Sequence, residues 1–299
     1  MNVLGIDFTS APGLKPLACI RCTFDGELLR AGEVERWSAY SRFENQLNAP
    51  GEWIAGIDFP FGQSRKFIEK IGWPTDWLAY VRHARSLGRE GFRDALDSFR
   101  KRQPYGEKEY RRKTDVAACS ISPQKIYFVP VGLMFFEGAP RLADSGVTIP
   151  YLHGGDPSRM VVEAYPGVLA RRVIVRRPYK HDSKDKQTQE RFDARCAILT
   201  RLLQGAARKL YGFEVEAPPN VCDDPAGDEL DALLCAIQAA WAWKNRENRF
   251  GAPSNADPQE GWIADPYVTG HCEQAATWQE RLTRDDASAG PLDEPGADE

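Results

Sequence analysis

Three short apolar runs that each end in an acid stand out in the hydrophobic pattern of this chain. The runs at 1–7 and 53–58 both close with Gly-Ile-Asp followed by Phe, and the run at 160–163 ends in Glu before Ala-Tyr-Pro-Gly. Short runs rich in Val and Ile that stop at Pro, Gly, Ser or Thr are typical of buried strands. A carboxylate at the end of such a strand is costly unless it is hydrogen-bonded or holds a cation. Each acid is therefore either a turn cap or part of a shared site.

The remaining N-terminal pattern predicts a meander. Alternating segments at 17–23 and 27–37 flank Phe24-Asp25-Gly26, and Asp-Gly between alternating segments is a strong hairpin signal. We therefore expect three antiparallel strands within 2–37. A short helix at 40–48 and a fourth strand at 53–58 follow.

Helical spacing of apolar residues dominates much of the rest. It predicts an inserted helical region at 63–113, an amphipathic helix at 188–211 and a nearly all-apolar, buried helix at 228–243. Residues 124–152 are apolar but broken by Pro and Gly, which indicates strand and loop. With the run ending at Glu163 as a fifth strand, the pattern predicts an α/β protein.

Composition limits the class of protein. The chain has 299 residues, of which 42% are hydrophobic and 27% charged, as in ordinary globular proteins. No apolar run approaches the ~20 residues that span a bilayer, and no signal-peptide pattern is present. The seven cysteines are scattered and lack zinc spacing. We expect a cytoplasmic protein with reduced thiols and no membrane partner.

The charge is unevenly distributed along the chain. Residues 251–299 contain eleven Asp and Glu against two Arg, a net of −9, so the total of −4 leaves +5 for residues 1–250. This predicts a domain at 1–250 and an acidic, flexible C-terminal tail at 251–299. Trp262, Tyr267 and Trp278 are the residues able to dock part of that tail.

Two segments are basic. Residues 82–113 contain eleven Lys and Arg against five acids, and residues 171–186 contain seven against two. Each is either a solvated surface or a surface for an anionic ligand. In the second case Tyr105 and Tyr110 are candidates for stacking on bases.

Asp228 and Asp231 add two acids in the first turn of the predicted buried helix, where both lie on one face. They either cap that helix or join Asp7, Asp58 and Glu163 in one site. Such a cluster of carboxylates requires protons or hard cations to neutralise it. Without His or Cys it suits Mg²⁺ or Mn²⁺ rather than zinc. Two such ions ~4 Å apart support phosphoryl-transfer chemistry.

Four phrases together resemble a known family. Gly-Ile-Asp7-Phe, Gly-Ile-Asp58-Phe-Pro, Glu163-Ala-Tyr-Pro and Asp228-Glu-Leu-Asp231-Ala resemble the family known as domain of unknown function 429, over about residues 2–245. That family is regarded as a predicted nuclease of ribonuclease-H-like fold. The resemblance implies a ribonuclease-H-like mixed five-stranded sheet flanked by helices, with the first and fourth strands adjacent and a helical insertion after the fourth.

The resemblance also implies roles for the acids. Catalytic roles would fall to Asp7, Asp58, Glu163, Asp228 and Asp231. Asp7 would bridge two Mg²⁺ or Mn²⁺ ions, and Asp58, Asp228 and Asp231 would help to hold them. Glu163 is an added acid that the general ribonuclease-H pattern does not require.

The predicted function is a Mg²⁺-dependent nuclease that hydrolyses phosphodiester bonds of DNA or RNA. One alternative is an ATP-handling phosphotransferase of actin-like or sugar-kinase type, since Asp7-Phe-Thr9-Ser10 suits its first phosphate loop. Only the segment 152–156 offers a second, Gly-rich loop for it. A second alternative is a non-catalytic module that binds nucleic acid or protein. GxSxG, GxxxxGK[ST] and GxGxxG motifs are absent from the sequence.

Overall fold

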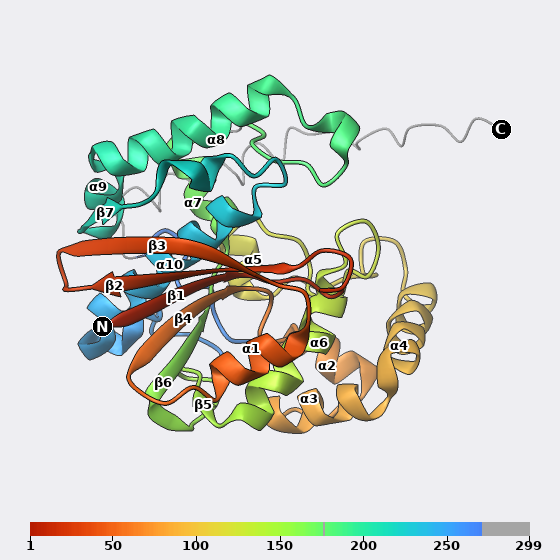
Figure 1. Ribbon diagram of the computed structural model, residues 1–299. Helices are drawn as coiled ribbons and strands as arrows, with labels where there is room; N and C mark the ends of the chain where they lie inside the picture. The colour runs from red at the N-terminus through yellow and green to blue at the C-terminus, as the bar shows by residue number, and fades with distance from the viewer. Residues whose placement is uncertain (176, 271–299) are drawn as a thin grey trace.

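The computed structural model describes residues 1–175 and 177–270, which form a mixed β-sheet with helices on both faces (Figure 1). The described strands are β1 (Asn2–Asp7), β2 (Leu17–Phe24), β3 (Leu28–Trp37), β4 (Trp53–Asp58), β5 (Val147–Thr148), β6 (Asp156–Glu163) and β7 (Glu214–Glu216). They are ordered β5-β6-β4-β1-β2-β3-β7 within the described residues. β2 runs antiparallel to both of its neighbours, and the other four strand pairs are parallel. The predicted α/β class is confirmed.

The expected five-stranded sheet is wrong, because the sheet has seven strands in the described part of the chain. The five predicted strands are all present, with β1 and β4 adjacent as expected. β5 and β7 extend the sheet at its two edges and have only two and three residues. Strands this short show no alternation of apolar and polar residues, so periodicity does not reveal them.

The helices occupy both faces of the sheet. The described α-helices are α1 (Tyr40–Leu47), α2 (Arg65–Ile71), α3 (Trp77–Ser86), α4 (Gly88–Arg102), α5 (Lys113–Ala117), α6 (Val131–Ser145), α7 (Pro166–Ile174), α8 (Gln189–Arg201), α9 (Ala207–Tyr211) and α10 (Asp228–Lys244). Helices α2 to α5 lie in or next to the predicted helical insertion at 63–113. Within the described residues, no helix is both long and apolar enough to cross a membrane.

Alternation along the strands produces two cores. Val3 and Ile54 point to one face, where they pack with α7, α8 and α10. Leu4 and Ile57 point to the other face, where they pack with helices of the insertion and with α6. Since side chains alternate along a strand, Gly5 and Asp7 share the α10 face with Val3.

Two glycines allow α10 to lie directly on the sheet. Gly5 and Gly56 are paired in register on β1 and β4. A Cβ at Gly5 would lie 1.8 Å from the Ala232 carbonyl oxygen, and one at Gly56 would lie 2.2 Å from the Cys235 carbonyl oxygen. The helix backbone therefore occupies the space that a side chain would need, which explains the Gly in both Gly-Ile-Asp phrases.

Two secondary-structure predictions need correction, one at 124–152 and one at 188–211. Residues 131–145 form helix α6 rather than strand and loop, since Pro130 stands at its N-cap and Pro140 is accommodated inside it. The helix predicted at 188–211 is interrupted between α8 and α9 by a π-helical turn, Leu202–Ala206. Gly205 has φ +103° there, a conformation that favours glycine. Pro140 thus does not break helix α6, whereas the segment at 188–211 is interrupted at Gly205.

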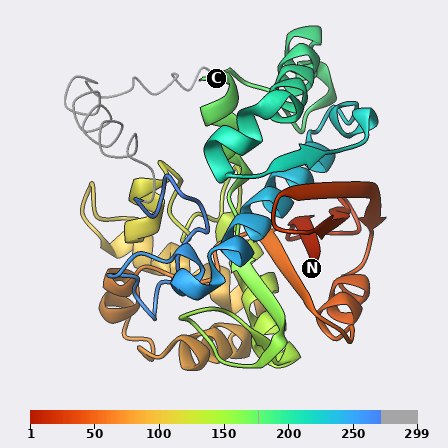
Figure 2. The ribbon, with the colours of Figure 1, turned by 90° about the vertical axis from the view of Figure 1, so that its left-hand side faces the viewer.

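The flexible tail does not begin at residue 251. Ala252, Trp262, Ile263 and Tyr267 are buried, and Ile263 forms a parallel bridge with Glu163. Figure 2 shows this segment continuing from α10 and passing beside α5. The docking expected of Trp262 and Tyr267 is confirmed, and it removes about twenty residues from the predicted tail. Trp278 and the rest of the acidic segment, 271–299, lie outside the described residues.

We predict that Gly5→Ala and Gly56→Ala each lower the free energy of unfolding by about 3 kcal/mol or more. The added methyl group meets rigid backbone of α10 rather than a side chain that can rotate away. Denaturant unfolding measures the change. Gly154→Ala is the matched control, because no atom lies within 4 Å of its added Cβ. Equal stability of all three variants would contradict direct packing of α10 on the glycine pair.

Candidate metal centre

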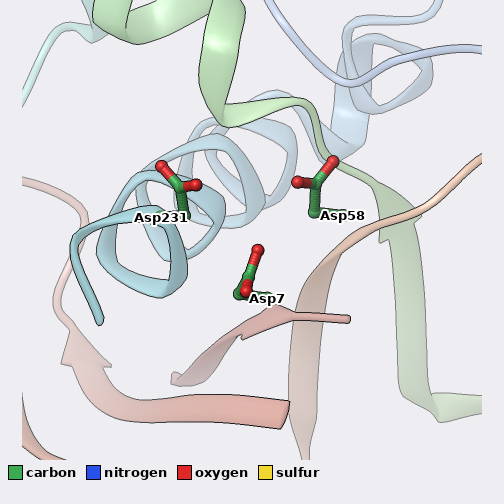
Figure 3. Close-up of side chains that lie close together, drawn as sticks. All are labelled: Asp7, Asp58 and Asp231. Atoms are coloured by element: carbon green, nitrogen blue, oxygen red, sulfur yellow. The ribbon is translucent and has the colours of Figure 1, made fainter. Parts of the chain in front are cut away.

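Three of the predicted acids meet at one end of the sheet. Asp7 ends β1, Asp58 ends β4 and Asp231 lies in the first turn of α10. One carboxylate oxygen from each lies within 4.8 Å of the others (Figure 3). We call these three residues the acid cluster. The predicted convergence of the ends of strands one and four with the start of the last long helix is confirmed.

The convergence follows from the sheet register and the glycine contact. Asp7 is paired with Asp58 between the parallel strands β1 and β4, two residues beyond the paired glycines. Because side chains alternate, both acids face α10. The close approach of α10 at Gly5 then places Asp231, one residue before Ala232, over the two strand ends.

Two members of the acid cluster have no protein partner among the described residues. The side chains of Asp7 and Asp58 accept no hydrogen bond and form no ion pair in this part of the chain. Burial raises the pKa of Asp7 well above its ordinary value, with Lys180 opposing and Asp231 reinforcing the rise. Burial likewise raises the pKa of Asp58 to about 7, again against the effect of Lys180. Both carboxyls therefore lack a compensating positive charge of their own.

Asp231 differs because both of its oxygens are occupied. The Tyr179 hydroxyl donates to Oδ1 at 2.6 Å, and the Lys180 ammonium donates to Oδ2. The Asp231 side chain is fully buried, whereas that of Lys180 is 36% exposed. Lys180 therefore lies at the mouth of the acid cluster and supplies its nearest positive charge within the described residues.

Asp228 flanks the acid cluster without joining it. Its side chain is buried and forms ion pairs with Lys15 at 3.0 Å and with Arg36 at 3.1 Å. Arg36 also pairs with Asp224 at 2.8 Å, and Asp224 accepts the amide hydrogen of Asp228. Asp228 thus belongs to a network of charges that closes the N-terminus of α10.

Glu163 is engaged in a buried ion pair. Arg112 donates to both of its oxygens, at 2.6 and 2.7 Å, and the Phe61 amide donates at 2.9 Å. Arg112, itself buried, also pairs with Asp115 and donates to the Glu260 carbonyl oxygen. Glu163 therefore links the helical insertion, strand β6 and the segment after α10, and the structure does not bring it into the acid cluster.

Within the described residues, four of the eleven cations in the basic segment at 82–113 form ion pairs: Arg85, Arg89, Arg100 and Arg112. Arg89 pairs with Glu137, and Arg100 lies 3.7 Å from Glu109. Tyr110 is buried, so the expectation that its ring stacks on bases is wrong, whereas Tyr105 is exposed. Residues 171–186, the second basic segment, place Tyr179 and Lys180 on the acid cluster instead.

Sequence reasoning missed the cations around the acids. Lys15, Arg36, Arg112 and Lys180 lie in loops or on a strand that no acid-bearing motif marks. The available signals were the excesses of positive charge at 82–113 and 171–186, which do not distinguish Arg112 or Lys180 from its neighbours. Their roles depend on chain segments that meet only in the folded protein.

The donor set fits a hard divalent cation. Three carboxylates from three elements offer only oxygen atoms, the ligands that Mg²⁺ and Mn²⁺ prefer. Two of them accept no hydrogen bond from the described residues. When ionised, these neighbouring carboxylates repel one another, so a bound cation would stabilise them. Comparisons with protein-family models, with curated proteins and with solved structures found no match. The chemistry of the site therefore rests on these residues alone.

We predict that the metal-free protein loses stability as pH rises from about 4 to about 7. In this range the folded protein retains protons on Asp7 and Asp58 that the unfolded chain has already released, so folding becomes less favourable as these groups ionise. The contribution of Asp58 is at most a few kcal/mol. Urea unfolding in EDTA at several pH values measures it. Asp58→Asn removes one titrating group and flattens the dependence; an identical slope would contradict the raised pKa of Asp58.

We also predict that Glu163→Gln lowers the free energy of unfolding by roughly 3 kcal/mol, because it leaves the buried Arg112 with one carboxylate fewer. Stabilisation of the protein by Mn²⁺ is unchanged, since Glu163 lies outside the acid cluster. Thermal unfolding with and without Mn²⁺ measures both effects. Glu44→Gln, which alters the exposed pair with Arg141, is the control and changes stability by less than about 1 kcal/mol. Loss of the Mn²⁺ response in Glu163→Gln would restore Glu163 to the metal site.

Proposed function

We propose that this protein is a metal-dependent nuclease whose acid cluster binds Mg²⁺ or Mn²⁺ and hydrolyses phosphodiester bonds of DNA or RNA. The observation that carries the proposal is the convergence of carboxylate oxygens of Asp7, Asp58 and Asp231 within 4.8 Å, with two of the three accepting no hydrogen bond from the described residues. A purely structural role does not require three carboxylates from separate elements to meet when two of them, Asp7 and Asp58, accept no hydrogen bond from the described residues. Hard cations at such a cluster activate water and stabilise the charge that develops on a phosphate.

Each residue has a distinct part in this proposal. Asp7 ends the central strand β1, which is paired with β4 and packs against α10, so it is the residue suited to bridging ions. Asp58 and Asp231 supply the flanking ligands. Asp228 holds Lys15 and Arg36 beside the cluster, where their positive charges favour an anionic substrate. Glu163 positions the Phe61 amide and the segment that follows Asp58.

The arrangement of strands supports a ribonuclease-H-like assignment. The resemblance to the family known as domain of unknown function 429 requires the first and fourth strands to be neighbours with acids at their ends. β1 and β4 satisfy this requirement, with Asp7 paired to Asp58. α10 supplies the third acid from the last long helix of the described chain, as the resemblance implies. The proposal keeps two ions, with the three clustered carboxylates shared between them.

An ATP-handling function has less support. Its second phosphate loop would have to be the segment at 152–156. There the amides of Leu152 and His153 donate to the Ile149 carbonyl oxygen, and that of Asp156 donates to Gly146. These amides are therefore not available to cradle a phosphate. A binding module without catalysis gives no reason for unpaired acids at the strand ends.

We predict that Asp7→Asn lowers phosphodiester cleavage by at least ~10²-fold, because an amide neither neutralises nor bridges divalent cations. The fold is retained, and the metal-free variant is at least as stable as the unaltered protein, since burial disfavours the ionised form of Asp7 and the amide does not ionise. Cleavage of single- and double-stranded DNA and RNA in Mg²⁺, Mn²⁺ or EDTA measures activity. Thermal unfolding under the same conditions measures the metal response.

Two controls decide between the candidate functions. Asp223→Asn alters an acid that lies one residue before Asp224 and outside the acid cluster, so cleavage is unchanged. ATP hydrolysis measured in parallel is expected to be absent. Metal-independent melting of the unaltered protein, together with a lower melting temperature of Asp7→Asn, would make these acids structural and exclude the nuclease. Asp7-dependent ATP hydrolysis without nucleic-acid cleavage would favour the phosphotransferase.

A further inference from the structure

Lys180 already binds one of the carboxylate oxygens that a divalent cation at the acid cluster could use. Its ammonium donates to Oδ2 of Asp231, and the charges of Asp7 and Asp58 act on it as well. The Tyr179 hydroxyl donates a hydrogen bond to the other carboxylate oxygen of Asp231, Oδ1. A cation that recruits Asp231 through Oδ2 must therefore take this oxygen from Lys180, while Asp7 and Asp58 need no such exchange within the described structure.

The backbone that carries Lys180 is fixed. Arg195, a buried residue, donates to the Tyr179 carbonyl oxygen at 2.8 Å and also to the Cys222 carbonyl oxygen at 2.8 Å. Gly227, the N-cap of α10, has φ +77°, and a Cβ there would lie 2.8 Å from Cβ of Lys180. The chain at 179–180 is thus held against the start of α10.

The end of the Lys180 side chain, by contrast, is partly exposed and is held by its bond to Asp231. The side chain is 36% exposed, and four methylene groups separate the ammonium from the fixed backbone. Displacement of the ammonium from Asp231 requires only rotation of this stem. After displacement the charge remains tethered at the mouth of the acid cluster, beside the place where a phosphate would meet the metal.

We infer that Lys180 is a displaceable counter-ion: it neutralises Asp231 in the metal-free protein, yields this carboxylate to the divalent cation, and then binds a phosphate oxygen of the nucleic-acid substrate. This inference rests on the proposed metal site and extends it by one residue. It predicts effects of opposite sign, because Lys180 competes with the metal and cooperates with the substrate. A structural lysine would affect both in the same direction.

Lys180→Met removes the charge and keeps most of the stem. We expect it to strengthen Mn²⁺ binding roughly tenfold, because a competing unit charge is lost from the cluster. We expect it to weaken binding of a short fluorescein-labelled deoxyoligonucleotide, measured in Ca²⁺ to limit cleavage, by a similar factor. Lys180→Arg retains the charge and changes each affinity less than about threefold. Isothermal titration with MnCl₂ and fluorescence anisotropy provide the two measurements.

Two further variants make the test specific. Lys15→Met removes a lysine that pairs with Asp228 and Asp182 rather than with Asp231. If it strengthens Mn²⁺ binding as much as Lys180→Met does, the effect is general electrostatics and the inference is wrong. In EDTA, Lys180→Met is expected to melt below the unaltered protein, and adding Asp231→Asn to it is expected to recover the loss. No recovery would likewise overturn the pairing.

Failure of the inference and failure of the proposed function give different results. If the unaltered protein binds Mn²⁺, Asp7→Asn does not, and Lys180→Met binds as the unaltered protein does, the metal site stands and the role of Lys180 is overturned. Weakening of both Mn²⁺ and oligonucleotide binding in Lys180→Met also overturns it. If the unaltered protein shows no Mn²⁺ binding by isothermal titration and no stabilisation by Mn²⁺ in thermal unfolding, the proposed metal site itself fails, and the inference fails with it.

Discussion

Direct contact between the backbone of α10 and two strand glycines is the constraint on which the rest of this structure depends. Gly5 and Gly56 leave no side chain between sheet and helix, so the helix lies closer than an ordinary layer of side chains allows. That spacing determines how far Asp231 is from Asp7 and Asp58. A shift of α10 by the width of one methyl group would therefore alter the packing of the core and the geometry of the acid cluster together.

The close packing creates an electrostatic problem that the surrounding residues solve unequally. Around the start of α10, Arg36 and Lys15 neutralise Asp228, and Asp224 satisfies amides of the first turn. Asp231 is neutralised by Lys180. Asp7 and Asp58 receive no comparable partner in the described chain, so their charge is available to a ligand. Asp228 and Glu163, each held by buried ion pairs, belong to the scaffold, whereas Asp7, Asp58 and the Lys180-paired Asp231 form the proposed site.

Much of the central architecture was predictable from the sequence, because the relevant signals are local. Apolar runs ending in Asp7 and Asp58 indicated strands, and an all-apolar segment after Asp228 indicated the buried helix. Their convergence followed from the cost of isolated buried carboxylates. The buried ion pair of Glu163, outside the acid cluster, was not predictable in this way, because its partner Arg112 lies in a basic segment whose sequence is typical of a solvated surface. Helix α6 was not predicted, because Pro and Gly interrupt the apolar segment at 124–152, although the structure accommodates Pro140 inside the helix.

The predicted domain boundary at residue 250 was wrong for a similar reason. Residues 252–268 carry no periodic pattern, yet much of the segment from 259 to 267 is buried, through isolated contacts such as the hydrogen bond from the Ile263 amide to Thr114. Loss of periodicity indicates the absence of a regular element, not the absence of packing. The acidic composition of the segment reinforced the error, because Asp265 is buried and hydrogen-bonded to Tyr211 and Gln238 rather than solvated.

The position of this last packed segment has a consequence for protein synthesis. On the ribosome, β1 and β4 emerge early with their acids, but Lys180 follows later and Asp231 later still. The Glu260 carbonyl oxygen and the amide of Ala264, which complete the surroundings of Arg112 and Glu163, emerge after all of these. A nascent chain therefore lacks the third carboxylate of the acid cluster until Asp231 is synthesised. The contacts around Arg112 and Glu163 are completed only when translation of the described body is nearly finished. A fragment of the described chain that stops before Asp231 therefore lacks one of the three carboxylates of the acid cluster.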